Sequence, residues 1–331
     1  MRYRFLSILL LSFFSLNFQG FAQSTLDSIP PKRQPIFFGG SFSNDILQLY
    51  GKSDGYFTNG VTARITGSFL RKLPSKHLLF GLKNSTSRLY TLELGQEIYT
   101  PLSIDSDGLL ENDRPYAGWF YATHSLESFD ELNRQKLTTS FQLGVTGKWA
   151  FAGTVQTKFH ELINNSLPQG WDNQIGNSVG LNYYLKYEKG LLNSNYIDFT
   201  PNVEAGLGSV YVYGATGFTL RLGLLDNFFS NDGKFYQRRG SNGKFKMYLT
   251  FSPTVGTMFR NSLLQGMPYG GNSPHLIPGS QINTFYFEGV SKLTLQYDRL
   301  RVSFNQNWKS PEFKGAESQR WGAVEVGIRL F

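Results

Sequence analysis

Histidine is the side chain best suited to general acid–base chemistry near neutral pH, and this chain of 331 residues contains four of them. His160 lies in the segment VQTKFHELINNSLP, which differs in pattern from the rest of the chain. Pro168 ends the segment, and apolar residues recur within it at helical spacing: Val155, Phe159, Leu162, Ile163 and Leu167. The pattern predicts one short amphipathic helix, on which His160 is either a general base or a solvated surface residue.

A second polar feature, Asn44-Asp45, interrupts the otherwise apolar segment SFSNDILQLYG. Successive side chains of a strand point to opposite faces, so one of the two must lie on the apolar face unless a β-bulge redirects it. An isolated carboxylate on such a face is costly unless it binds something. The pair therefore marks either a functional site or the end of a strand at a membrane rim.

Composition excludes several other classes of site. The chain has no Cys, so it holds no disulfide, no cysteine metal ligand and no cysteine nucleophile. His160-Glu161 lacks the second histidine of a helical zinc site. The formal net charge is +8, but the basic residues do not gather with aromatic residues on one element, so nucleic acid is not an expected partner.

Three regions follow one another along the chain. A basic start, an almost wholly apolar run and the small-x-small end Gly20-Phe21-Ala22 predict a secretory signal peptide over residues 1–22. Residues 23–36 are polar and rich in Pro, and they predict a short N-terminal tail. Residues 37–331 are expected to form a single domain, either an exported soluble β protein or an outer-membrane barrel.

Period-two alternation recurs through that domain and predicts strands with one apolar and one polar face. Near the C-terminus, for example, Val324, Val326, Ile328 and Leu330 alternate with charged residues and are expected to face lipid. Long strands, charged polar faces and aromatic residues near strand ends favour a membrane barrel over a soluble sandwich. We therefore predict an all-β fold, a closed antiparallel transmembrane β-barrel of about 12 strands with one short helix in a loop. The predicted strands are 37–50, 56–71, 88–100, 115–128, 136–150, 176–190, 195–209, 211–225, 244–260, 282–298, 299–309 and 318–331.

The connections between the predicted strands are unequal in length. The long ones are 72–87, 101–114, 226–243 and 261–281. Because outer-membrane barrels have long loops on one side and short turns on the other, these four are expected on one side. Of the remaining histidines, His77 and His275 lie in loops, and His124 on a strand is expected to face the lumen.

Five motifs in fixed order carry a family resemblance: SNDIL, GYFTNG, LGQEIYTP, NDRPYAGWFYA and QTKFHELINNSLPQGWDNQIGN. In this order they resemble the outer-membrane lipid A 3′-O-deacylases, and the resemblance extends over 37–331. It implies a 12-stranded barrel in the outer membrane of a Gram-negative bacterium, with its active site toward the outer leaflet. It also implies hydrolysis of the 3′ ester-linked acyl chain of lipid A, the lipid anchor of lipopolysaccharide, with calcium as cofactor.

The same resemblance implies roles for individual residues. The catalytic histidine corresponds to His160, the calcium-binding carboxylate to Asp45, and the polar groups beside them to Asn44 and Thr58. Further residues within the motifs are expected to support the site or to contact substrate: Asp113, Arg114, Trp171 and Gln174.

Two positions depart from the family pattern. A lysine expected soon after Pro101 is missing, and no basic residue follows before Arg114. A calcium-binding glutamate expected six residues after the histidine is replaced by Ser166. Either fewer carboxylates hold the metal, or another acid such as Glu161 or Asp172 serves.

These residues would suffice for ester hydrolysis. His160 could activate a water molecule, and calcium on Asp45 could stabilise the developing oxyanion, because calcium prefers oxygen ligands and acts as a Lewis acid. Asn44 and Thr58 could donate hydrogen bonds, and no covalent intermediate is required. The alternatives are an acyl hydrolase acting on phospholipid, and a passive channel or binding barrel. We expect a monomer.

Overall fold

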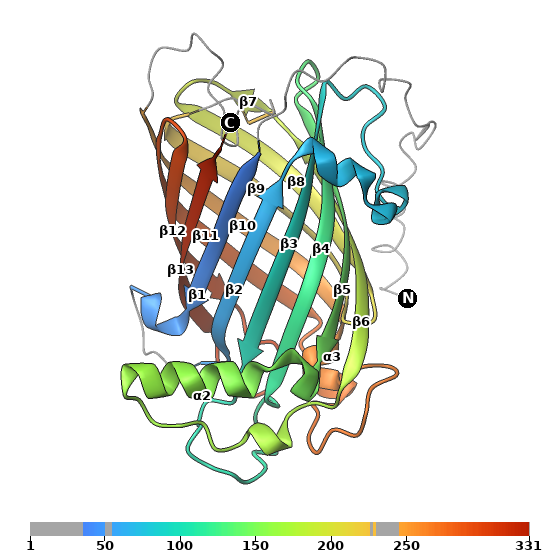
Figure 1. Ribbon diagram of the computed structural model, residues 1–331, viewed down its shortest axis with the longest axis vertical. Coiled ribbons are helices and arrows are strands. Elements are labelled where there is room, and N and C mark those ends of the chain that lie inside the picture. The colour runs from blue at the N-terminus through green and yellow to red at the C-terminus, as the bar shows by residue number, and fades with distance from the viewer. Residues whose placement is uncertain (1–35, 50–54, 226–227, 230–244, 331) are drawn as a thin grey trace, which may run out of the picture.

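The computed structural model describes residues 36–49, 55–225, 228–229 and 245–330, so the predicted signal peptide and nearly all of the tail lie outside the described residues. Twelve described strands form one closed antiparallel barrel (Figure 1). They are β1 (Phe37–Asn44), β2 (Phe57–Thr66), β3 (Ser87–Tyr99), β4 (Ala117–Asp130), β5 (Gln135–Thr146), β6 (Ser178–Lys189), β8 (Ile197–Gly208), β9 (Tyr211–Leu224), β10 (Phe245–Asn261), β11 (Phe285–Tyr297), β12 (Leu300–Lys309) and β13 (Gln319–Arg329). Pairing of β1 with β13 and of β6 with β8 closes the ring, and the two-residue β7 (Leu192–Asn193) pairs with β8 alone. The predicted barrel is confirmed. None of the described helices has the length and apolar character needed to cross a membrane.

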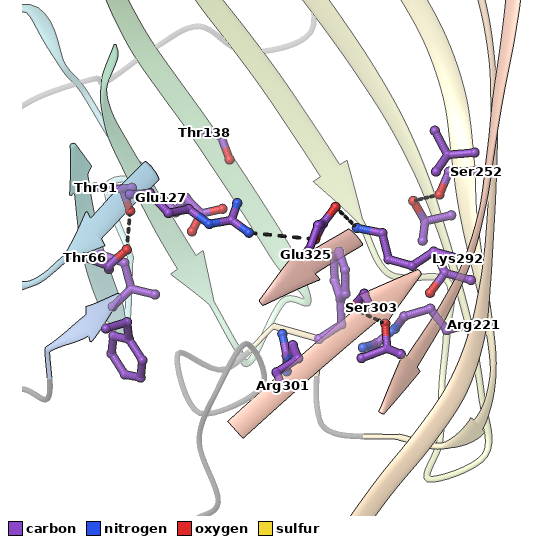
Figure 2. Close-up of a pocket in the computed structure, with 18 of the residues that line it drawn as sticks. Thr66, Thr91, Glu127, Thr138, Arg221, Ser252, Lys292, Arg301, Ser303 and Glu325 are labelled. Carbon is purple, nitrogen blue, oxygen red and sulfur yellow. Dashed lines mark hydrogen bonds and ion pairs between the residues drawn. The ribbon is translucent and has the colours of Figure 1, made fainter. Parts of the chain in front are cut away.

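The two faces of the wall differ as the alternation predicts. Val326 and Ile328 are exposed on the outside of β13, whereas Glu325, the neighbour of Val326, points into the lumen. There Glu325 accepts a hydrogen bond from Lys292 at 2.8 Å, and both side chains line a cavity of about 530 Å³ (Figure 2). Apolar residues outside and charged residues inside are the pattern of a barrel embedded in lipid.

Long connections occur at both ends of the barrel, so the predicted one-sided arrangement is wrong. Antiparallel strands reverse direction, and successive connections must therefore alternate between the two ends. One end, here the α2 end, holds the connections 100–116 and 262–284 together with helix α2 (Ala152–Ile163). The opposite, termini end holds the start of β1, the end of β13 and the connection 67–86. The predicted loop 226–243 joins β9 to β10 at this end and lies largely outside the described residues.

The lumen is filled at the α2 end. Helix α3 (Ser262–Gln265) places Leu263 and Leu264 in apolar clusters, the second of which also contains Ile277 and Phe313. These side chains are almost completely buried. The connections therefore fold inward and form an apolar plug across this end of the barrel.

A charged cluster completes the plug around the carboxylate of Glu312. It accepts hydrogen bonds from Arg114 Nη1 at 3.2 Å, Lys309 Nζ at 2.8 Å and Gln319 Nε2 at 2.7 Å. Burial alone would favour the neutral acid, but the positive charges of Lys309 and Arg114 outweigh it and lower the pKa of Glu312 to about 2. The plug is thus held by an ionised, paired carboxylate.

Candidate active site on the outer wall

Helix α2 lies across the outside of the barrel wall, over the ends of the first strands (Figure 1). Gly118 on β4 allows this close approach, because a Cβ at that position would lie 2.5 Å from the Cβ of Ala152. Gln96 on β3 donates a hydrogen bond from Nε2 to the carbonyl of Ala150 at 2.6 Å. At the other end of the helix, the rings of Phe159 and Phe42 are 6.1 Å apart. The predicted helix is present and is fixed to the wall along its length.

The side of α2 that faces the wall carries two polar residues. Ala152, Gln156 and His160, spaced four residues apart, are buried against the wall. Val155 and Leu162 are exposed, and Leu162 is 82% exposed. Polar residues therefore face the wall, while the exposed surface of α2 combines apolar residues with the ion pair of Lys158 and Glu161.

The chain just after α2 determines the state of the His160 ring. Asn164 adopts a left-handed conformation at the C-cap, and the N–H of Asn165 bonds to the carbonyl of His160 at 2.9 Å. The chain then turns back, so that the carbonyl of Ser166 lies 2.5 Å from His160 Nδ1. A carbonyl oxygen can only accept, so Nδ1 carries the hydrogen and the lone pair of the neutral ring is on Nε2. The position that departs from the family glutamate therefore orients the histidine through its backbone.

Asn44 lies on the outward row of β1 that includes the exposed Phe38, and β1 ends there. Its Oδ1 accepts the N–H of Ile46 at 2.9 Å and starts the 3-10 turn η2 (Asp45–Leu47). Its Nδ2 donates to the carbonyl of Thr58 at 2.9 Å, which leaves one amide hydrogen for another acceptor. The strand therefore ends at the polar pair, and the turn redirects Asp45.

The irregularity predicted near this pair lies on the neighbouring strand. The register of β2 against β3 shifts between Phe57 and Asn59, which marks a bulge at Thr58. The hydroxyl of Thr58 lies 2.8 Å from that of Thr100, at the end of β3. The bulge thus turns the Thr58 hydroxyl away from the regular alternation of the strand.

A pocket of about 390 Å³ between α2 and the wall brings these residues together. Four residues predicted from separate motifs line it: Asn44, Asp45, Thr58 and His160. The sequence analysis did not identify several further polar lining residues, among them Thr100, Asp105 and Gln156. Apolar side chains, among them Ile46 and Ile163, complete the lining, as is common in sites that bind small molecules.

Trp171 and Gln174 support this pocket from behind the helix. Trp171 Nε1 donates to Oε1 of the buried Gln156 at 2.7 Å, and its ring packs 5.0 Å from that of Tyr116. Gln174 Nε2 in turn donates to the carbonyl of Trp171 at 2.8 Å. These contacts fix the inner face of α2, and neither residue lines the pocket.

Asp113 and Arg114 do not line the pocket. The carboxylate of Asp113 accepts the backbone N–H groups of Leu102 and Arg114 at 2.8 and 2.7 Å. The guanidinium of Arg114 is buried over the ring of Tyr99, 4.2 Å from its centroid, and pairs with Glu312. Arg114 therefore belongs to the plug and does not replace the missing family lysine.

Of the three carboxylates proposed on sequence as metal ligands, only Asp45 lines the pocket. Glu161 bonds to Lys158 at 2.7 Å and Asp172 lies 3.4 Å from Lys148, and neither lines the pocket. Asp45 and Asp105 do line it, together with Ser166. The described residues contain no group of three or more His, Cys, Asp or Glu side chains suited to a metal. The donors present are oxygen atoms, which fit a hard cation such as calcium better than zinc.

One further sequence motif resembles that of a serine nucleophile but has a structural role here. GNSVG at 176–180 has the G-x-S-x-G form of a nucleophile elbow, which requires a sharp turn between a strand and a helix. Ser178 instead begins β6, is buried, and donates to the carbonyl of Val179 at 3.3 Å. The motif therefore supplies no nucleophile.

The fold and this pocket define an outer-membrane β-barrel with a polar site on the lipid side of its wall. The sequence profile of one family, described as outer membrane protein LpxR, matches residues 6–330. The chain belongs to this family, which confirms the resemblance found in the motifs and the location in the outer membrane. No protein with a curated description matches the sequence.

Comparison with solved structures supports the fold through one match with a TM-score above 0.5 among those described here. LpxR from Salmonella typhimurium superposes with a TM-score of 0.71 at 18% identity, over 89% of this chain and 100% of that one. The β domain of the Bordetella autotransporter BrkA gives a TM-score of 0.42 at 10% identity, over 89% and 98% of the two chains. The translocator domain of NalP from Neisseria meningitidis gives 0.39 at 11% identity, over 92% and 91%.

Proposed function

We propose that the protein is an ester hydrolase that removes the 3′-linked acyl chain of lipid A in the outer leaflet of the outer membrane. The observation that carries the proposal is the pocket on the outer wall, where His160 on α2 meets three oxygen- or amide-bearing side chains of the wall and of the turn after β1. A lipid ester can reach such a pocket from the bilayer without entering the lumen. The family resemblance of the motifs supports lipid A as the substrate.

In this mechanism His160 acts as a general base. Its Nε2 takes a proton from a water molecule, whose oxygen attacks the ester carbonyl carbon, while the Ser166 carbonyl holds Nδ1. The tetrahedral intermediate collapses, the bond to the sugar oxygen breaks, and His160 returns the proton to that oxygen. The products are a free fatty acid and a sugar hydroxyl.

The oxyanion needs donors or positive charge on the opposite side of the carbonyl. The second amide hydrogen of Asn44 and the hydroxyl pair of Thr58 and Thr100 can donate to it. Asp45 and Asp105 would hold a calcium ion, which when bound would supply positive charge as a Lewis acid. We propose calcium as the cofactor on the chemistry of these donors.

The plug argues against a passive channel as the function. A channel needs a continuous polar path, whereas buried Leu263, Leu264 and Phe313 cross the lumen at the α2 end. The polar residues of the outer pocket would also have no use in a channel. Both observations favour an enzyme that works on the outside of its barrel.

Reconstituted protein incubated with lipid A and with phosphatidylethanolamine, in separate reactions, tests the substrate. We expect mass spectrometry to show lipid A losing one 3′ acyl chain and phosphatidylethanolamine remaining intact. Release from phosphatidylethanolamine alone would instead identify a phospholipid acyl hydrolase. No release from either lipid would contradict the hydrolase assignment.

A further inference from the structure

A second segment lies on the outside of the wall, at the termini end. Residues 67–86 include the 3-10 turns η3 (Ser68–Lys72) and η4 (Pro74–Leu78) and run outside the barrel at the upper right of Figure 1. Ser75 Oγ lies 2.8 Å from His124 Nδ1, Leu82 N donates to Ser128 Oγ at 2.9 Å, and Thr139 Oγ1 donates to the carbonyl of Phe80 at 2.9 Å. The segment is therefore fastened to β4 and β5.

These contacts correct the predicted orientation of His124. Ser125 and Glu127 line the lumen cavity, so His124, which alternates with them, points outward. A polar side chain on the lipid side of a barrel is costly, and the segment covers it. Residues 67–86 thus replace lipid over a polar part of the wall.

The surface that the segment itself presents is basic. It contains Arg71, Lys72, Lys76 and Lys83 and no acidic residue. Lys72 and Lys83 are exposed, and Lys76 is partly exposed. Because the segment joins the end of β2 to the start of β3, these cations lie on the side of the wall that is nearer to the termini end.

Apolar side chains lie among these cations. Phe69 and Leu78 are exposed, and the ring of Phe80 stacks on Tyr183 with centroids 6.3 Å apart. Tyr183 belongs to the outward row of β6 that includes the exposed Leu181, so the apolar surface of the segment is continuous with the lipid-facing wall. Cations at the rim with apolar groups beside them match a lipid that has an anionic headgroup and acyl chains.

We propose that residues 67–86 bind an anionic phospholipid, with its phosphate near Lys72, Lys76 and Lys83 and its acyl chains against Phe69, Leu78 and Phe80. In the orientation of the proposed function, this lipid belongs to the inner leaflet. The binding is separate from ester hydrolysis, and its test uses no enzymatic readout. A bound lipid would anchor the end of the barrel opposite the active site.

Bilayers that contain brominated lipids provide the test. A Leu78→Trp reporter is placed in bilayers with equal fractions of brominated phosphatidylglycerol or brominated phosphatidylethanolamine, and the fluorescence quenching is compared. The five native Trp residues all lie toward the α2 end, and the parent protein supplies their background. We expect phosphatidylglycerol to be preferred by about five-fold or more, since each cation near an anionic surface favours binding by about that factor.

Variants assign the preference to the segment. Combined Lys72→Gln, Lys76→Gln and Lys83→Gln in the reporter should bring the ratio of the two lipids close to one. The matched control, with Lys148→Gln, Lys158→Gln and Lys314→Gln at the α2 end, should leave the preference unchanged. Equal quenching by both lipids in the parent reporter, or an undiminished preference in the first triple variant, would overturn the proposal.

Discussion

His160 and His124 are buried on the same outer wall to nearly the same extent, with 6% and 4% of their surface exposed. His124 belongs to β4 and is covered by residues 67–86, whereas His160 belongs to the covering helix α2 and faces the wall. Each has its Nδ1 in a hydrogen bond, His160 to Ser166 and His124 to Ser75. They differ at Nε2. That of His160 belongs to a ring lining a pocket of about 390 Å³, whereas that of His124 is sealed and has no hydrogen-bond partner among the described residues.

The comparison distinguishes two regions in which a segment covers polar residues on the outside of the wall. Under 67–86 the polar groups contact the covering segment directly, and the result is stability. Between α2 and the wall, by contrast, a pocket remains beside Asn44, Asp45 and Thr58. Burial and an oriented ring are therefore common to both histidines, and reachable space is what makes one of them suited to catalysis.

The largest expected effect comes from replacing the two histidines in turn. His160→Ala should reduce acyl release by about 10²- to 10⁴-fold, because a general base contributes that much. His124→Ala should leave turnover close to that of the parent. Turnover on lipid A is the measurement, with heat-modifiable migration as the check that both barrels fold. Equal losses in the two variants would remove the distinction between the sites.

A variant in the plug serves as a reference for activity that is lost because the barrel is destabilised. Glu312→Gln should destabilise the barrel by about 3–5 kcal/mol, because Arg114 and Lys309 stay buried without their counter-charge. Urea unfolding measures this cost. Variants that lose activity because the barrel is destabilised should have a lowered unfolding free energy, as Glu312→Gln does. His160→Ala should have the unfolding free energy of the parent.

The same carboxylate gives a pH dependence with a defined sign. The pKa of Glu312 is lowered to about 2, below the value of about 4.3 for an unfolded glutamate. Its stabilising contribution is therefore complete above the unfolded value and is lost as the pH falls through the folded one. The difference in unfolding free energy between parent and Glu312→Gln should stay constant from about pH 5 to 8 and shrink below about pH 4. A difference that varies across the neutral range would argue against this pairing.

Metal dependence is the next test of the α2 pocket. Asp45→Asn should lower turnover by about 10²- to 10³-fold, the usual cost of removing one source of oxyanion stabilisation. Chelation should lower the turnover of the parent similarly, and added calcium should restore the parent but not the variant. Asp172→Asn is the matched control, since that carboxylate lies outside the pocket. Full activity after exhaustive chelation would remove calcium from the mechanism and leave His160 in place.

The smallest effect is expected under 67–86. Ser75→Ala removes the hydrogen bond to His124 Nδ1 and leaves a buried ring unsatisfied, which should cost about 1–3 kcal/mol in unfolding free energy. Turnover should not change, because the site lies at the other end of the wall. A change in turnover without a change in stability would contradict this and would show that residues 67–86 influence the pocket under α2.

The strands could be predicted closely because each carries its own alternation of apolar and polar residues, and the barrel repeats that pattern. The prediction that the His124 side chain faces the lumen was wrong for a related reason. A polar residue on a strand was assigned to the lumen, and no local pattern shows that residues 67–86 will cover the outside. The placement of long connections was also wrong, although strand reversal alone assigns 72–87 and 101–114 to opposite ends.

The site was predictable where a motif carries it, as for Asn44, Thr58 and His160. Asp105 was missed because its approach to the pocket depends on how the loop after Pro101 folds. The role of Ser166 was missed because its backbone carbonyl, and not its side chain, bonds to the histidine. Local spacing contains neither kind of information.

The central claim is that water activated in the α2 pocket cleaves the 3′ acyl ester of lipid A. Mass spectrometry of both products, formed from purified lipid A in ¹⁸O-labelled water, tests it most directly. We predict a free fatty acid with ¹⁸O in its carboxyl group, a lipid A product with an unlabelled 3′ hydroxyl, and neither product from the His160→Ala protein. Undiminished release by His160→Ala, label in the sugar hydroxyl, or no fatty acid from the parent protein would contradict the account.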